Sequence, residues 1–518
     1  MKGGKVMKRF ILFTLVLTLA CGFLVTHGVQ PASAAEKGKY GGILKFNHSK
    51  PAGIIGNPMM IRGWNNEYAA IPLENLIQAD PVNLGQLAPR LATSWELAPD
   101  RSNYTLKLRK GVKFHDDTPF NAQAVKWNLD KWVNSSSAVL KEVQSVEVID
   151  DYTIRLNLSA WNNVTIYQLA MDVWIVSPTA FEKNGEKWAN YHPVGTGPFK
   201  MVEFKRNVSI KFEKFKDYYE EGLPYLDGIH ILHIADPMTA SASLKKGEVD
   251  GWMNVEQVTA SNLAKEGKLE VSTGFGPYYL INFNSVDPES PWSKLKMREA
   301  LEYAIDREAV ARVTGRGFRF PVSNVLYGVD NEKAGTTPRK YNPEKAMQLM
   351  SEAGYPNGLN IKLFHMAGQE KDAATIFQGS LAEVGIKVQL EALAGAAWHG
   401  KLFEPIKGSE LVWGFLPGSL INPIQSAYQF MSEKSPLFQT VKRPVGFYEA
   451  LNQAVSREDL NSGLGDIYQA EKLAYESAML CPVLVTKFVA LNAPYVKDAY
   501  WFYASAPRPN LKHAWLDR

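Results

Sequence analysis

Short strands alternate with amphipathic helices along most of this chain, and this alternation restricts the fold more than any other feature. Apolar residues recur at every second position in 104–108 and on both sides of a polar turn at 150–151, which predicts a strand and a hairpin. Residues 125–133 carry apolar side chains at helical spacing. The pattern predicts an α/β fold with mixed sheets.

Further elements repeat this alternation. Additional strands are predicted at residues 43–46, 208–212, 229–234 and 386–390. A pair of helices is predicted within 296–313. Another helix has clear boundaries, because Asn342 can act as its N-cap, Pro343 suits its first turn and Gly354 follows its last turn.

The length of the chain excludes a single hydrophobic core. It has 518 residues, whereas one core stops growing at about 250–300 residues, so we expect two or more lobes. The sequence is 46% apolar, which excludes a disordered chain. Aromatic residues make up 11% of it, enough to line a large cavity with rings.

The first 34 residues are predicted to be an export signal. A basic start is followed by an apolar stretch from Phe10 to Val25 and by small residues that permit cleavage after Ala34. A membrane anchor is the first alternative, but the apolar stretch is shorter than the ~20 residues that span a bilayer. Acylation of Cys21 as a lipoprotein is the second, and the residues before Cys21 fit it poorly. We therefore expect a periplasmic or extracytoplasmic protein.

The charge balance argues against a nucleic-acid partner. Residues 1–34 hold four basic residues and no acidic one, and the rest of the chain has 53 of each. Binding to phosphates would need a basic surplus. After cleavage a single cysteine, Cys481, remains, which excludes an intrachain disulfide. Cys481 lies in an apolar run and is predicted to be buried.

Catalytic motifs are absent from the sequence. It contains no G-x-S-x-G, H-E-x-x-H, C-x-x-C or Walker sequence. Residues 193–199 (PVGTGPF) lack the Lys of a phosphate loop and are predicted to be a tight chain crossing. Residues 115–117 (HDD) are predicted to be a solvated turn, and the histidines lack metal-ligand spacing. We expect no enzyme, no metal and no cofactor.

Several segments in order along the chain resemble one family, the family-5 solute-binding proteins of bacterial ABC importers, which includes peptide, dipeptide and nickel receptors. The segments are 91–96 (LATSWE), 104–120 (YTLKLRKGVKFHDDTPF), 193–199 (PVGTGPF), 282–284 (NFN), 298–307 (REALEYAIDR), 341–356 (YNPEKA to AGYP) and 385–388 (GIKV). The family usually has Gly where this chain has Asp117, which is a small departure at a turn.

The resemblance implies a periplasmic-binding-protein-like fold of two lobes joined by hinge strands, with a subdomain inserted in lobe I. Lobe I would comprise 35–71, 195–285 and 486–518, the inserted subdomain 72–194, and lobe II 286–485. The chain would cross the hinge near Asn284 and Val485. The implied function is a receptor that closes over a solute and delivers it to a membrane permease, acting as a monomer.

The resemblance is incomplete in the loop that sets specificity. Peptide-binding relatives carry an Asp there that pairs with the α-ammonium of the peptide, and this position falls on Gly418 or Ser419. No carboxylate occurs between Glu410 and Glu433. Burying an ammonium without a counter-charge costs several kcal/mol. An ordinary free peptide would lose this anchor unless a carboxylate from elsewhere, such as lobe I, replaces it.

Six residues are the candidate ligand contacts: Trp398, Trp413, Phe415, Ser419, Asn47 and His48. Trp398 is expected just after a change from strand to loop, and Trp413 and Phe415 in the specificity loop itself. For these aromatic residues, core packing is an equal alternative. For His48 the alternative is a surface histidine. Tyr278 and Tyr279 are expected to pack rather than bind. A pocket of such residues would suit a peptide-like, neutral or amphipathic solute.

Two other functions remain open on the sequence alone. A receptor of the same fold could signal to a chemotaxis or sensor protein, and neighbouring permease genes would separate that role from import. A secreted hydrolase would require turnover that disappears when one polar residue is changed.

Overall fold

The computed structural model describes residues 39–80, 86–135, 139–368, 370–416, 422–433, 435–502 and 508–518. They belong to one compact unit, Lys37–Arg518. The predicted signal peptide, Cys21 and Ser419 lie outside the described residues. Within the described ranges, no helix is both long and apolar enough to cross a membrane.

An eleven-stranded mixed sheet forms the centre of the fold. Its strands, in spatial order, are β10 (Phe199–Lys205), β11 (Ser209–Lys214), β12 (Gly228–Leu232), β1 (Ile43–His48), β13 (Gly251–Met253), β19 (Cys481–Asn492), β14 (Glu270–Phe283), β18 (Leu411–Leu416), β16 (Leu359–Met366) and β17 (Ile386–Leu393). A further strand, β15 (Arg319–Pro321), pairs with β19. The sheet and its helices confirm the predicted α/β class.

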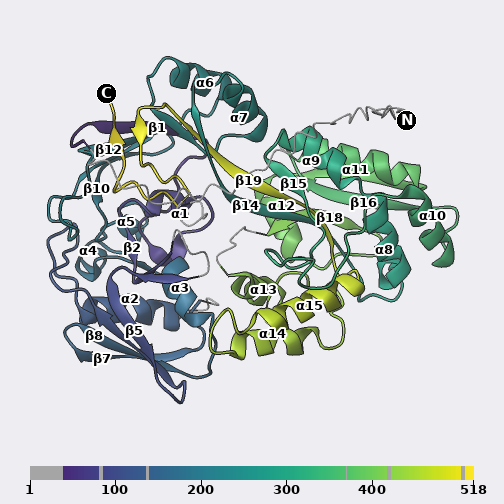
Figure 1. Cartoon of the computed structure of the whole chain (residues 1–518), viewed down its shortest axis with the longest axis horizontal. Helices are drawn as coiled ribbons and strands as arrows, with labels where there is room; N and C mark the ends of the chain where they lie inside the picture. Colours follow the sequence, from purple (N-terminus) through teal and green to yellow (C-terminus); the bar gives the residue numbers. More distant parts are fainter. Residues whose placement is uncertain are drawn as a thin grey trace, which may run out of the picture. The chain divides into compact units, whose positions relative to one another are not determined.

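Two long antiparallel strands, β14 and β19, run side by side through the middle of the sheet (Figure 1). They pair from Glu270 opposite Asn492 to Ile281 opposite Cys481, with irregular register between Phe275 and Tyr278. Strands β1, β12 and β13 lie on one side of this pair, and β18, β16 and β17 on the other. The two strands include or adjoin both predicted hinge crossings. The division into lobes stays a prediction.

Helices pack on both halves of the sheet. In chain order they are α6 (Pro237–Lys245), α7 (Gln257–Ala264), α8 (Leu295–Ala304), α9 (Arg307–Gly315), α10 (Pro343–Glu352), α11 (Lys371–Glu383), α12 (Gly395–Phe403), α13 (Pro423–Met431), α14 (Phe447–Ser456) and α15 (Leu464–Glu476). The predicted cap is confirmed, because the Asn342 side chain accepts from the Lys345 N–H at the start of α10. Gly354 follows α10 with φ +91°, a conformation that favours glycine.

A separate four-stranded sheet lies within residues 92–158. It consists of β5 (Ala92–Leu97), β6 (Asn103–Leu108), β8 (Thr153–Leu158) and β7 (Val143–Asp150), and α2 (Ala122–Val133) packs against it. The predicted hairpin is confirmed as β7 and β8. The remaining elements of the fold are α1 (Asn65–Ala69), α3 (Thr165–Met171), α4 (Pro178–Asn184), α5 (Glu186–Ala189), and the small pairs β2 (Glu74–Asn75) with β9 (Trp174–Ile175), β3 (Ile77–Ala79) with β4 (Leu87–Pro89), and β20 (Val496–Lys497) with β21 (Trp515–Leu516).

The segment around Gly195 is a tight crossing, as predicted. A Cβ atom on Gly195 would lie 2.2 Å from the carbonyl oxygen of Pro72, so only glycine fits between the two chains. The prediction of a solvated turn at 115–117 was wrong for His115. Its Nε2 atom donates to the Gly197 carbonyl at 2.9 Å, and burial lowers the pKa of the imidazole to about 4. Asp117 has φ +66°, which explains why glycine suits this position.

The segment that leads into α3 contacts the C-terminal end of α14. The backbone N–H of Asn163 donates to the Val455 carbonyl at 2.8 Å, and its side chain donates to the Ala454 carbonyl at 2.8 Å. The indole of Trp161 donates to the Ser456 carbonyl at 2.9 Å. The predicted inserted subdomain and the helices α13–α15 therefore share one buried cluster.

Candidate functional site

An aromatic wall forms where β18, β14 and α12 meet, and it consists of Trp398, Trp413, Phe415 and Tyr279. Trp413 and Phe415 are two residues apart on β18 and so share a face of the sheet. Tyr279 lies directly opposite Phe415 on β14. Its ring stacks on Trp413 at 5.2 Å between centroids and contacts Phe415 at 5.5 Å.

Trp398 completes the aromatic wall from α12. Its ring stacks on Phe415 with centroids 5.1 Å apart and an interplanar angle of 25°. Its indole N–H donates to the Trp413 carbonyl at 3.2 Å, which fixes the helix against the strand. Sequence reasoning placed these residues in loops, and that was wrong. Trp398 lies in a helix, whereas Trp413 and Phe415 lie in a strand.

The four rings differ in exposure, which separates structural support from contact surface. Trp413 and Trp398 are fully buried, whereas Phe415 is partly exposed. Phe403, at the end of α12, is 50% exposed. Trp398, Trp413 and Tyr279 are therefore buried packing partners, and Phe415 is the ring of the wall with the most exposed surface.

A buried ion pair that the sequence did not reveal supports the aromatic wall. Glu370, just before α11, accepts from Arg319 Nη2 at 2.9 Å and from the Trp413 indole N–H at 2.9 Å. Burial, and then the charge of Glu370, raise the pKa of Tyr279 well above its ordinary value. Arg319 and Glu370 are distant in the sequence and belong to no motif, so only the folded chain shows that they pair.

The other two described candidates, Asn47 and His48, form a separate group. Both lie in β1 rather than after it, which corrects the predicted strand end. Four strand spacings of ~4.8 Å place β1 about 19 Å from β18 within the sheet. The structure therefore does not bring the candidates together at one point.

Hydrogen bonds within the protein occupy Asn47 and His48. The Asn47 side chain accepts from the Ile234 N–H at 2.8 Å. His48 Nδ1 accepts from the Lys50 N–H at 3.1 Å, so Nε2 carries the proton and donates to Glu67 at 2.7 Å. His48 is 1% exposed, which excludes the surface position considered from the sequence. Ligand contact by either residue stays a prediction.

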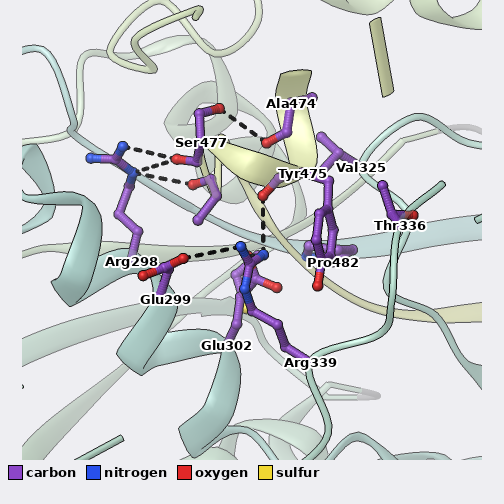
Figure 2. A network of polar contacts seen from close by, with 12 residues as sticks. Arg298, Glu299, Glu302, Val325, Thr336, Arg339, Ala474, Tyr475, Ser477 and Pro482 are labelled. Atoms are coloured by element: carbon purple, nitrogen blue, oxygen red, sulfur yellow. Dashed lines mark hydrogen bonds and ion pairs between the residues drawn. The ribbon is translucent and has the colours of Figure 1, made fainter. Parts of the chain in front are cut away.

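The Arg-rich motif at 298–307 forms a structural network, seen in Figure 2. Arg298 donates to the Ser477 carbonyl from Nε at 3.1 Å and from Nη2 at 2.8 Å. Arg339 donates to Glu302 at 3.2 Å and to the Tyr475 carbonyl at 3.0 Å. These contacts fix the end of α15 against α8, and Arg307 Nε donates to the Pro482 carbonyl at 2.7 Å, at the start of β19. The motif therefore positions a central strand.

The buried cysteine and possible metal ligands also relate to the sequence predictions. Burial raises the pKa of the Cys481 thiol to about 12. In the ranges that the structure describes, no group of three or more His, Cys, Asp or Glu side chains could hold a metal ion.

The central mixed sheet with its helices is an α/β architecture of the periplasmic-binding-protein type. The family model for bacterial extracellular solute-binding proteins, family 5, matches residues 86–408. This chain belongs to that family. The predicted family and fold class are therefore confirmed.

Individual relatives agree with this assignment. The glutathione-binding protein GsiB of Pectobacterium atrosepticum is 34% identical over 312 residues, which cover 58% of this chain and 60% of that relative. The chain thus spans about 60% of the length of the curated relatives it matches.

Two solved structures share the fold. DppA from Helicobacter pylori, in complex with the peptide STSA, has a TM-score of 0.77 and 23% identity, covering 94% of this chain and 100% of DppA. CtaP from Listeria monocytogenes has a TM-score of 0.79 and 18% identity, covering 93% of this chain and 100% of CtaP.

Proposed function

We propose that this protein is an extracytoplasmic receptor that binds a small peptide-like or amphipathic solute and delivers it to the permease of an ABC importer. Membership of the family supports the receptor role. The names of relatives support the solute class, since one binds glutathione and another is in complex with a short peptide. In this proposal the protein binds without turnover, as a monomer, after cleavage of its signal peptide behind Ala34.

The observation that supports the proposal most is the partly exposed Phe415 ring, which stacks on Trp398 and contacts Tyr279 at an interplanar angle of 55°. A ring that its neighbours already hold in place loses little conformational freedom when a solute packs on it. The buried hydrogen bonds of Trp398 and Trp413 keep this face in place. The aromatic wall is therefore preorganised for an apolar group of the solute.

The carboxylate closest to the aromatic wall does not replace the missing ammonium anchor. The Glu370 carboxylate already pairs with the Arg319 guanidinium and accepts from the indole N–H of Trp413. An added ammonium would compete with a buried guanidinium, which costs several kcal/mol. In this proposal the peptide ammonium is not the main contact in this half of the site.

Calorimetry with glutathione and a set of di- to pentapeptides tests the proposal. Trp398→Ala and Phe415→Ala should each weaken the tightest interaction by about 1–3 kcal/mol, the range for a buried anchor at an interface. Trp188→Ala is the matched control, because Trp188 also stacks on a neighbouring ring, that of His192 at 4.3 Å, but lies on α5. The affinity of Trp188→Ala for the same solute should stay within about twofold of the wild-type value.

Two results would count against this site. Wild-type protein that binds none of these probes would remove the peptide-like solute class. Variants of Trp398 and Phe415 that melt early but bind normally when folded would assign both rings to the core.

A further inference from the structure

The C-terminal end of α14 is capped by residues of the predicted inserted subdomain. The last four carbonyls of a helix have no partner within the helix. Two of them in α14, the carbonyls of Ala454 and Val455, accept from the side chain and the backbone N–H of Asn163, both at 2.8 Å. The Ser456 carbonyl accepts from the Trp161 indole at 2.9 Å. One short segment of the subdomain therefore bonds three of these four carbonyls.

A cation strengthens this cap. Arg101, which also belongs to the predicted subdomain, donates from Nη1 to the Ser456 carbonyl at 3.1 Å. Its guanidinium lies 5.4 Å from the centre of the Trp161 ring, so the two side chains support each other. The C-terminal end of a helix carries a partial negative charge, which a guanidinium compensates.

Helix α13 makes similar contacts with the subdomain. Gln425 and Tyr428 are three residues apart on α13 and so share one of its faces. The Gln425 side-chain amide donates to Asp172 at 3.3 Å, and the Tyr428 hydroxyl donates to Glu142 at 3.1 Å. Both carboxylates belong to the subdomain. We name all of these bonds the cross contacts, and they are made by Arg101, Trp161, Asn163, Gln425 and Tyr428.

The cross contacts join two parts of the chain that are connected through β14 and β19. The chain enters residues 284–480, which include α13 and α14, at the end of β14 and leaves them at the start of β19. The subdomain precedes β14 in the sequence. In the residues that the structure describes, no strand of the subdomain pairs with a strand of 284–480. A hinge movement in β14 and β19 can therefore separate the two parts without breaking a sheet, and it would break the cross contacts.

We propose that the cross contacts form a latch that holds a fraction of the receptor closed before solute arrives. This inference rests on the proposed receptor function and concerns the regulation of its solute site. A hydrogen bond that forms only in the closed protein shifts the ratio of open to closed forms by about 2- to 12-fold. The apparent affinity for solute rises with the fraction of protein that is closed. Solute supplies the rest of the free energy of closing.

Small-angle scattering of the full exported chain without solute tests the latch. Asn163→Ala removes the side-chain amide of the cap, and Tyr428→Phe removes one hydroxyl and keeps the ring. Each change should shift the ratio towards the open form by about 2- to 12-fold, so the solute-free radius of gyration should increase, most of all in the double variant. Saturation with glutathione or the tightest-binding short peptide should return the radius to that of the wild-type complex. The dissociation constant of each single variant should rise by up to about 12-fold.

Asn128→Ala is the matched control for Asn163→Ala. The two asparagines are almost equally buried, at 3% and 2% exposed. Asn128 Nδ2 also donates to main-chain carbonyls, those of Ala124 at 2.9 Å and Val176 at 2.8 Å, but both carbonyls lie in the same subdomain as Asn128. Asn128→Ala should lower the melting temperature and leave the solute-free radius of gyration unchanged.

Tyr341→Phe is the matched control for Tyr428→Phe. Tyr341 also donates from its hydroxyl to a glutamate, Glu383 at 2.6 Å, but both residues lie in predicted lobe II. Its solute-free radius should equal that of the wild type. If Asn163→Ala does not fold, Tyr428→Phe still tests the latch, because it keeps the whole ring.

The outcomes separate the latch from the receptor proposal. If the double variant melts cooperatively and its solute-free radius equals that of the wild type, the latch is overturned, because the subdomain then moves together with α13 and α14. An equal increase of the radius in the controls would also overturn it. Expansion of the double variant alone, in a protein that binds no probe, would support the latch and count against the peptide-like solute. A protein that neither binds a probe nor expands would overturn both.

Discussion

Replacing Glu370 by Gln should destabilise the protein while leaving a correctly folded solute site. Gln keeps an acceptor for the Trp413 indole but removes the charge that compensates Arg319. The side chains of Arg319 and Glu370 are only 5% and 2% exposed, so solvent cannot screen the charge that remains. Breaking a buried pair in this way costs about 3–5 kcal/mol.

The expected change in melting temperature depends on how much of the chain melts together. Unfolding entropy is ~2.1 cal/mol/K per residue, or about 1 kcal/mol/K for some 480 residues, so a single transition would shift by about 3–5 °C. If the predicted lobe II melts in a separate, earlier transition, about 200 residues contribute and its melting temperature falls by about 7–12 °C. Calorimetric melting distinguishes these two cases.

The double variant Arg319→Met with Glu370→Gln is the control, since replacing both charges removes the uncompensated one. It should recover at least half of the lost stability. Solute affinity of folded Glu370→Gln should stay within about threefold of wild type. An unchanged melting temperature together with a large loss of affinity would refute the reasoning, because Glu370 would then contact the solute.

Three further predictions concern other parts of the fold. Cys481 should not react with dithiobis(nitrobenzoate) at pH 8 in the native protein, because it is fully buried and burial raises the pKa of its thiol to about 12. It should react once guanidinium unfolds the chain. Rapid labelling of the native protein would contradict the buried position. Burial raises the pKa of Glu471 to about 8, so the folded state keeps a proton that the unfolded state releases near pH 4.3. The melting temperature should therefore fall as pH rises from 5 to 8 and stay level above pH 8. If the melting temperature of Glu471→Gln changes with pH as steeply as that of the wild type, Glu471 is not the cause. Gly195→Ala should lower stability by about 1–3 kcal/mol through the clash with Pro72, whereas Gly379→Ala, inside α11 with open space around it, should raise stability by up to about 1 kcal/mol; equal effects would contradict the tight crossing.

Local elements could be predicted because their causes are local. Asn342, Pro343 and Gly354 define α10 through a cap, a favourable first turn and a residue at positive φ, and all three act within one helix. The strand pattern of 104–108 was equally reliable, since alternate burial is a property of one strand. The tight crossing at Gly195 followed from the lack of a Lys and an N–H that a phosphate loop requires.

The candidate site was only partly predictable, because its main contacts are non-local. Phe415 was identified, but its place in a strand depends on pairing with Tyr279, more than a hundred residues away. The pairing of Glu370 with Arg319 has no sequence signal, since it joins segments that only the fold brings together. His48 was misjudged because its partner Glu67 lies on a different element.

Small-angle scattering during a solute titration tests the central claim most directly. The claim is that two lobes joined by β14 and β19 bind one solute between them. Glutathione is the first probe, followed by whichever short peptide gives the tightest calorimetric binding. At saturation the radius of gyration should decrease, because only a closed form contacts solute from both sides. A radius that stays unchanged while the binding heat saturates would contradict the account.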